Sequence, residues 1–104
     1  MPRLRLHQLV ASEFEEGLAW YADLSPLAAE NFTACFYLAL AKMEKHPNAQ
    51  ASWRPPFRRI RLPRFPYLLI FHTDQRMTSV LALVHERREP RRTLATLIQR
   101  RKQF

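Results

Sequence analysis

The hydrophobic positions of this chain repeat with two different periods, which divide it into a helical part followed by a strand-rich part. Between Ser25-Pro26 and His46-Pro47, apolar residues recur at intervals of three and four, as on one face of an α-helix. This stripe consists of Phe32, Cys35, Phe36, Ala39, Leu40 and Met43. Serine caps helices, proline suits their first turn, and a residue before proline disfavours helical geometry. We therefore predict a helix between Ser25-Pro26 and His46-Pro47. Its cysteine is expected to lie in the core and not to act as a nucleophile.

A strand and a second helix are predicted before this one. Residues 3–10 begin with charged and apolar residues in alternation, which is typical of a half-buried strand. Ser12 and Glu15 have the spacing of a capping box, so a helix is expected to begin there and to end near Leu24. Its apolar face would hold Phe14, Leu18, Tyr21 and Ala22. Because the connection between the two helices is so short, they are expected to form an antiparallel hairpin.

The second half of the chain has the shorter period of β-strands. Residues 47–57 contain three prolines and are predicted to form a loop. Alternation and apolar runs then predict three strands, at 58–62, 67–73 and 78–86. In the first of them, Ile60 and Leu62 share one face and arginines occupy the other. The last two strands are joined by a short turn, which makes them antiparallel neighbours.

These elements give the order β-α-α-β-β-β and predict an α+β fold, a single domain over residues 1–104 in which the helical hairpin packs on a small antiparallel sheet. Residues 67–71 and 80–84 are apolar on both faces, whereas a strand with one wet face would alternate. The second face must therefore be covered, either by the C-terminal segment or by a partner protein. The C-terminal segment could bring its few apolar residues together in one or two amphipathic turns. Those residues are Leu94, Leu97 and Ile98.

The composition excludes several classes of function. The single glycine, Gly17, rules out the glycine-rich loops of nucleotide-cofactor sites, so no cofactor is expected. The four histidines have no metal-ligand spacing, and the single cysteine allows neither a cysteine pair nor an intrachain disulfide. No signal peptide or membrane-spanning run is visible. We expect a cytoplasmic protein without a metal.

Charge is distributed unevenly along the chain. Residues 1–53 carry four cations and six acids, a net of −2, whereas residues 54–104 carry thirteen cations and three acids, a net of +10. Arginine supplies fourteen of the seventeen cations, and its planar fork matches carboxylate and phosphate groups. The basic half is therefore expected to meet an anionic partner, either nucleic acid or an acidic protein.

Several segments resemble one known group of proteins. They are FEEGLAWYADLSPLAAENF, RRIRLPRFPYLLIF and VLALVHERREP. In this order, over roughly residues 3 to 91, they are similar to the RelE/ParE superfamily of toxins from bacterial type II toxin–antitoxin modules. The helical hairpin and the His-x-Arg-Arg run are most similar to the ParE side, which includes plasmid stabilisation proteins. Members usually carry glycine and aspartate where this chain has Glu86 and Glu89, and Glu86 is expected to pair with a nearby arginine.

The resemblance implies two functions that differ in kind. A ParE-like toxin would arrest growth by binding DNA gyrase, without chemistry of its own. A RelE-like toxin would be an enzyme that cleaves mRNA on the ribosome, and a third possibility is an inactive member. Both kinds of toxin are held inactive by a cognate antitoxin, whose commonly acidic tail would cover the second apolar face of the sheet and meet the basic half. Without it, the protein is expected to self-associate as a homo-oligomer.

Candidate site residues follow from the two functions. Ribonuclease chemistry needs an acid–base pair and cations, for which the candidates are His85, Tyr67, Arg61 and Arg88. The binding function, which we favour, would use Arg59, Arg61, Arg87 and Arg88 to hold the partner. His85 would then be a strand end that bonds a neighbouring backbone group. Regular alternation would place His85 and Arg87 on one face and Arg88 on the other. Trp20, Tyr21 and Trp53 are expected to pack in the core or on helix faces.

Overall fold

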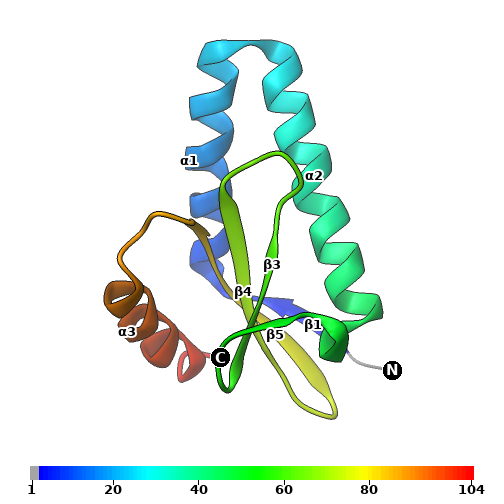
Figure 1. Ribbon diagram of the computed structural model, residues 1–104, viewed down its shortest axis with the longest axis vertical. Helices are drawn as coiled ribbons and strands as arrows, with labels where there is room; N and C mark the ends of the chain where they lie inside the picture. Colours follow the sequence, from blue (N-terminus) through cyan, green and yellow to red (C-terminus); the bar gives the residue numbers. More distant parts are fainter. Residues whose placement is uncertain (1–2) are drawn as a thin grey trace.

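A five-stranded sheet forms the centre of the fold, and the computed structural model describes residues 3–104 around it (Figure 1). The elements in chain order are β1 (Arg3–Leu6), α1 (Gln8–Leu24), α2 (Pro26–Lys45), a 3-10 turn (Pro47–Ala49), β2 (Ala51–Arg54), β3 (Phe57–Arg61), β4 (Tyr67–Thr73), β5 (Met77–His85) and α3 (Pro90–Arg101). The predicted α+β class and the helical hairpin on a sheet are confirmed. None of the helices in this described part is long and apolar enough to span a membrane.

The sheet is mixed rather than purely antiparallel. Its strand order is β1-β5-β4-β3-β2, and β1 runs parallel to β5 while the other neighbours are antiparallel. The prediction of an antiparallel sheet was wrong for β1, which pairs with β5 although two helices and three strands separate the two along the chain. Short turns join only antiparallel strands, and local alternation does not reveal the direction of so distant a partner.

Residues 47–57 are not a loop throughout, since they contain β2 and the start of β3. β2 pairs with β3 through Ala51 opposite Arg59, and the two strands turn at Pro55-Pro56. Trp53 and Phe57 pack against the apolar cluster on the α3 side of the sheet. Proline suits a hairpin turn and an edge strand, so the prolines mark the turn of this hairpin and do not abolish its strands.

The first helix begins five residues earlier than the capping box predicted. His7 is the N-cap of α1, and its Nδ1 accepts the backbone N–H of Leu9 at 3.1 Å. Ser12 lies inside the helix, where its hydroxyl donates to the Leu9 carbonyl oxygen at 2.9 Å. Histidine is not among the favoured capping residues, which is why Ser12 was the stronger signal in the sequence. On the predicted apolar face, Ala22 is exposed.

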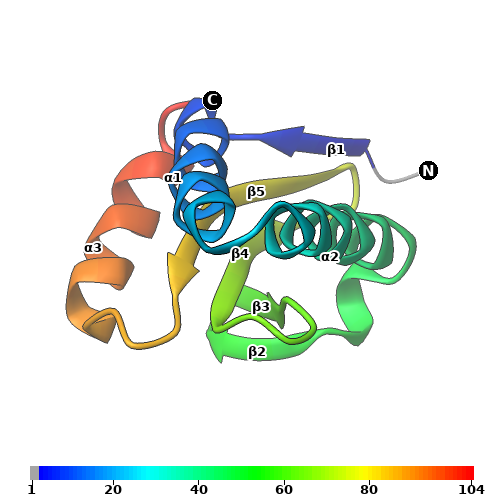
Figure 2. The same cartoon turned by 90° about the horizontal axis from the view of Figure 1, so that it is seen from above.

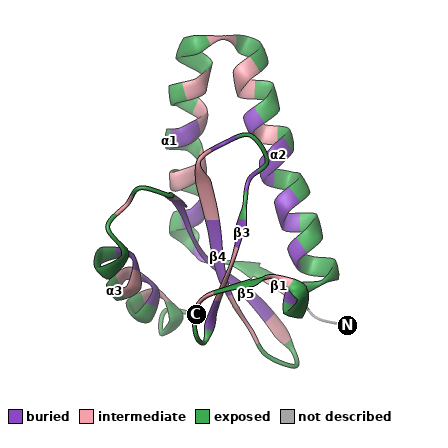
Figure 3. Ribbon diagram, in the orientation of Figure 1, coloured by how far each residue is buried: buried purple, intermediate pink, exposed green. Residues whose placement is uncertain are grey.

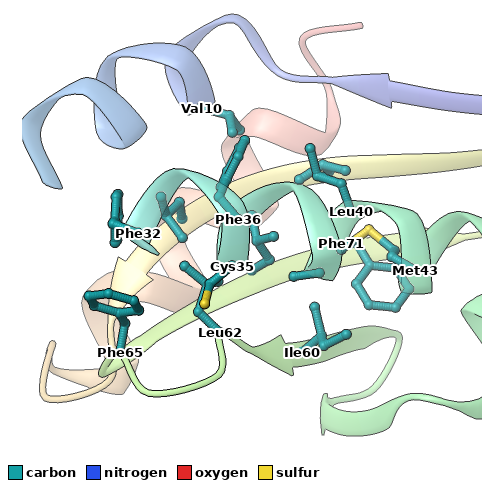
Figure 4. Close-up of a cluster of buried hydrophobic side chains, with 14 residues drawn as sticks. Val10, Phe32, Cys35, Phe36, Leu40, Met43, Ile60, Leu62, Phe65 and Phe71 are labelled. Carbon is teal, nitrogen blue, oxygen red and sulfur yellow. The ribbon is translucent and has the colours of Figure 1, made fainter. Parts of the chain in front are cut away.

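The second helix and its core face are as predicted. Ser25 caps α2 by accepting the N–H of Ala28 at 2.9 Å, and its own N–H donates to the Tyr21 carbonyl at the end of α1. All six residues of the predicted stripe are buried in one cluster with the inner face of the sheet (Figure 4). This cluster, which we call the hairpin core, also receives Phe14, Leu18 and Tyr21 of α1 as partly buried members. Cys35 is confirmed as a core residue.

The other face of the sheet is covered by α3, which lies next to α1 and beside the end of β5 (Figure 2). Beneath α3 is a second, smaller cluster, the α3 core, whose buried members are Phe57, Ile70, Leu81, Ala82, Val84 and Leu97. Strand β5 is accordingly buried along most of its length, and β4 is buried in its middle (Figure 3). The expectation that an antitoxin must complete this face was wrong, because the C-terminal segment forms a 12-residue helix that completes it.

Polar contacts hold α3 and the C-terminus to the rest of the fold. Arg100 donates to Glu13 of α1 at 2.9 Å and to the Leu81 carbonyl oxygen at 3.0 Å. Farther along, Gln103 Oε1 and His7 Nε2 lie 2.6 Å apart. The Arg5 guanidinium lies 3.9 Å from the centre of the Phe104 ring. The last residues are therefore bound across the N-terminal strand and helix.

Candidate partner-binding site

A cleft opens where β5 ends, between α1 and the turn that leads to α3. Its volume is about 340 Å³. The residues that line it are Glu13, Glu16, Gly17 and Trp20 of α1, Tyr67 at the start of β4, Leu83, Val84 and His85 of β5, and Arg88. It thus brings three of the sequence-predicted candidates, Tyr67, His85 and Arg88, together with side chains from the first helix.

One edge of β5 has no strand beside this cleft. β1 is matched to Met77–Val80 only, and the His7 N–H donates to the Val80 carbonyl at 2.8 Å where β1 ends. A bulge follows, because Phe71 is matched to Val80 and Ile70 to Ala82. A bulge adds one residue to a strand and shifts the alternation of its peptide groups. From this point to His85, β5 has β4 on one side and, within residues 3–104, no strand on the other.

Side chains occupy part of this open edge. The Leu83 N–H donates to Glu13 Oε1 at 3.1 Å, and the Leu81 carbonyl accepts the Arg100 guanidinium at 3.0 Å. A buried peptide group without a partner is costly, so these side chains supply the hydrogen bonds that a neighbouring strand would make. The Glu13–Arg100 pair closes the edge at one end, and the cleft begins beyond it.

His85 and Tyr67 pair across β4 and β5 at the mouth of the cleft. Their rings are 5.4 Å apart at an interplanar angle of 71°, an edge-to-face contact. His85 Nδ1 accepts the Arg87 N–H at 3.1 Å, so a neutral ring carries its proton on Nε2. This is the backbone bond expected of a histidine at a strand end. Burial first, and the Glu16 carboxylate second, raise the pKa of Tyr67, so its hydroxyl stays protonated near neutral pH.

The arginines after His85 do not follow strand alternation. β5 ends at His85, and the Arg88 N–H donates to the His85 carbonyl at 3.0 Å, which closes a turn. The alternation that would place His85 and Arg87 on one sheet face held only for a strand that continues without a bend at Glu86, and the strand ends before that residue. The Arg88 guanidinium donates to Thr96 of α3 at 3.0 Å, and Arg88 also lines the cleft. Arg87 is exposed.

Arg59 and Arg61 lie away from the cleft, on β3. Arg59 is matched to Ile70 and therefore shares the α3 side of the sheet. Arg61 donates to Glu86 at 3.0 Å, which is the expected pairing of Glu86 with an arginine. This hydrogen bond is the main cause of the lowered pKa of Glu86. Arg61 does not line the cleft with the other three ribonuclease candidates.

The cleft offers binding groups of both signs and no site for a metal ion. Carboxylates come from α1, a guanidinium comes from the turn, and the rings of Trp20, Tyr67 and His85 are available for packing. Among the described residues 3–104, no three histidine, cysteine, aspartate or glutamate side chains gather as metal ligands would. A site of this kind can hold a peptide through ion pairs, backbone hydrogen bonds and ring contacts.

The sequence did not indicate the α1 side of this site. Trp20 was expected to pack in the core or on a helix face, but its side chain is 65% exposed at the cleft. Glu13, Glu16 and Trp20 recur at intervals of three and four on α1, the spacing of one helix face. That spacing was the available signal, although nothing local shows that this face borders an open strand edge. Of the other two aromatic residues in that expectation, Tyr21 packs on the hairpin core and Trp53 on the α3 core.

Comparisons with known proteins agree on one group of relatives. The chain is 30% identical over 89 residues to "Toxin ParE2" of Mycobacterium tuberculosis, in strain CDC 1551 / Oshkosh and in strain ATCC 25618 / H37Rv, and the match covers 85% of this chain and 85% of each relative. The fold is similar to a solved chain of the "Chromosomal ParDE TA system from P. aeruginosa", with a TM-score of 0.71 and 18% identity over 82% of this chain and 96% of that one. No family model matches.

Proposed function

Because the chain belongs to the ParE family of toxins, we propose that it inhibits DNA gyrase by binding and is neutralised by a cognate antitoxin. The observation that carries this proposal is the likeness to two ParE2 toxins over most of the chain, in a fold shared with a protein of a ParDE system. The chain itself is the toxin component of a toxin–antitoxin system.

The arrangement of charges supports a binding mode of action. Arg87 is exposed, and Arg91 and Arg92 are exposed in the first turn of α3, where Glu89 caps the helix by accepting both of their N–H groups. Cations at a helix N-terminus oppose the helix dipole, so this cluster does not serve the stability of α3. Together with Arg88, it offers a basic surface to gyrase or to an acidic antitoxin. Arg59 and Arg61 extend the proposed surface on β3.

The alternative is a RelE-like ribonuclease, and one observation favours it. Tyr67, His85 and Arg88 line the same cleft, so a proton donor, a base and a cation are near one another. Two features oppose catalysis. The His85 Nδ1 already accepts a backbone N–H, and Arg61 is held by Glu86 outside the cleft.

Two assays on the purified protein separate these functions: gyrase supercoiling with DNA, and cleavage of ribosome-bound mRNA. His85→Ala should leave growth arrest largely intact, whereas Arg87→Ala with Arg88→Ala should reduce it through lost affinity. Circular dichroism shows whether each variant is folded. A ribonuclease would lose on the order of 10²-fold or more in cleavage rate without its general base. Loss of growth arrest in a folded His85→Ala protein, with mRNA cleavage by the wild type, would replace the gyrase proposal by the ribonuclease.

A further inference from the structure

A second cavity lies between the turn of the β2–β3 hairpin and the C-terminal half of α3. Its volume is about 570 Å³, within the range of pockets that bind small molecules. The residues that line it are Pro55, Pro56 and Phe57 of the hairpin, Leu94, Ile98 and Arg101 of α3, and the helix C-cap Lys102. None of them lines the cleft at the end of β5, so this is a separate site.

The interior of this cavity is apolar and poor in hydrogen-bonding groups. Phe57 is buried and Leu94 is half-buried, whereas Ile98 is 47% exposed and is not covered by the sheet. Pro55 and Pro56 have no backbone N–H to donate, and α3 uses its own N–H groups within the helix. A polar group buried here would lose its hydrogen bonds to water without replacement. The buried part of a ligand should therefore be hydrocarbon.

The rim of the cavity carries two cations, and no acidic residue lines it. Arg101 and Lys102 are exposed there, and no ion pair found among residues 3–104 involves either of them. Burial first, and the charge of Arg101 second, lower the pKa of His72 on β4, so the positive potential extends to the sheet. An anionic group is attracted to this rim, and a cationic group is repelled.

The charge of the rim also argues against a second copy of this chain as the occupant. Residues 54–104 carry a net charge of +10, and a symmetric dimer through this cavity would place the same basic rim against itself. Like charges brought together across an interface disfavour association. An occupant with one apolar end and one anionic end avoids this repulsion and fills the apolar interior.

We propose that this cavity binds a free medium-chain fatty acid, with its alkyl chain against Phe57, Leu94 and Ile98 and its carboxylate at Arg101 and Lys102. Burial of the alkyl chain would supply affinity, and charge-assisted hydrogen bonds to the carboxylate would fix the orientation of the ligand. The bound chain would contact both the hairpin turn and α3, and so hold the helix to the hairpin. The inference goes beyond the proposed function and does not depend on gyrase or on the antitoxin.

The test uses the full-length protein with Trp20→Phe, which leaves Trp53 as its one tryptophan. Trp53 packs on the α3 core together with Phe57, so its fluorescence reports on the cavity. The ligand is decanoate below the concentration at which it forms micelles, and the matched ligands are decanol and decyltrimethylammonium. We expect decanoate to shift the fluorescence with saturation, decanol to bind about tenfold more weakly, and the ammonium ligand more weakly still. Decanoate should also raise the unfolding temperature, because it binds the folded state.

Two matched double variants test the charged rim. Arg101→Gln with Lys102→Gln should weaken decanoate binding about tenfold and leave decanol binding unchanged, because only the carboxylate loses its contacts. Arg91→Gln with Arg92→Gln is the control, since it removes the same net charge from the first turn of α3, outside the cavity. Ile98→Asn tests the apolar wall and should weaken the binding of both decanoate and decanol.

Several results would overturn the inference. They are a fluorescence response to decanoate that does not saturate, equal binding of decanoate and decyltrimethylammonium, and equal losses in the two double variants. Sedimentation with phosphatidylglycerol vesicles, without a response to free decanoate, would assign the surface to a membrane instead. Circular dichroism at saturating decanoate must show a folded protein, because a lost helix signal would mean that the ligand unfolds the chain as a surfactant and has no site.

Discussion

The two faces of the sheet are covered in different ways. The hairpin core has fourteen buried members and several ring–ring contacts, among them Phe14 with Phe36 at 4.4 Å and Tyr21 with Phe65 at 4.8 Å. The α3 core has six buried members, and α3 and the residues after it are also held by the Arg100 ion pair, the Gln103 hydrogen bond and the cation–π contact of Phe104. Burial of apolar area is the larger stabilising effect, whereas polar contacts fix the orientation of the groups that they join. One face thus supplies most of the stability, while the other fixes where the C-terminal helix lies.

The largest effect is expected from the hairpin core. Phe32 is fully buried and contacts the rings of Phe14, Tyr21, Phe65 and Tyr67. Phe32→Ala should lower the free energy of unfolding by about 3–5 kcal/mol, because it removes a large side chain and leaves a cavity.

Urea unfolding measures this loss, and Leu38→Ala provides its control. Leu38 lies on the same helix and is 62% exposed, so its removal should change stability by less than about 0.5 kcal/mol. Equal losses for the two variants would contradict the burial that distinguishes them.

A smaller effect is expected from the polar clamp on α3. The Arg100 and Glu13 side chains are only 11% and 17% exposed, so Arg100→Met would leave a mostly buried carboxylate with one backbone donor. We expect a loss of about 2–3 kcal/mol in the free energy of unfolding. Arg101→Met is the matched control, since Arg101 is exposed one residue further along. If both variants are as stable as the wild type, the α3 face is held by its apolar core alone.

The single glycine tests how tightly the hairpin core is packed. A Cβ atom at Gly17 would lie 2.7 Å from Phe32 Cζ, too close without a shift of that ring. Alanine normally stabilises a helix by about 1 kcal/mol relative to glycine. Here overpacking costs about 1–3 kcal/mol, so Gly17→Ala should be destabilising by about 1 kcal/mol in total. Thermal unfolding measures the sign of this change in stability. A higher unfolding temperature for Gly17→Ala than for the wild type would show that the Phe32 ring can move to make room for the added methyl group.

The smallest effect concerns pH and involves His72 on β4. Burial first, then Arg101, lower the pKa of His72 below its ordinary value of 6.5. The unfolded chain therefore binds more protons than the folded one below that pH, so stability falls as pH drops from about 6.5 through the folded-state pKa. Urea midpoints at several pH values should show this decline, and His72→Asn should flatten it. The same decline in the variant would assign it to other groups.

The sequence predicted the parts of the fold that depend on local signals. The buried stripe of α2, its Ser25 cap and the alternation in 58–62 all act within a few residues. β2 was missed because its sequence, ASWR, has no clear alternation, and its pairing with β3 depends on tertiary packing. The start of α1 was missed because His7 is an unusual cap.

The candidate site was predicted on one side only. Tyr67, His85 and Arg88 were expected from the resemblance, and the structure brings them to one cleft. Glu16 and Trp20 join them because β1 stops at Leu6, which leaves the edge of β5 next to α1 uncovered. No local pattern encodes where a neighbouring strand stops, so this half of the site becomes visible only in three dimensions.

Ser25 gives the helical hairpin an unusual mechanical property. This one residue ends α1 with its N–H and starts α2 with its hydroxyl, so the tip contains no flexible loop. Proteases need several extended residues in their active sites, and the tip offers none without unwinding a helix. The exposed Leu24 and Leu27 beside it therefore lie on a rigid tip, and a force applied there would be transmitted along both helices to the sheet.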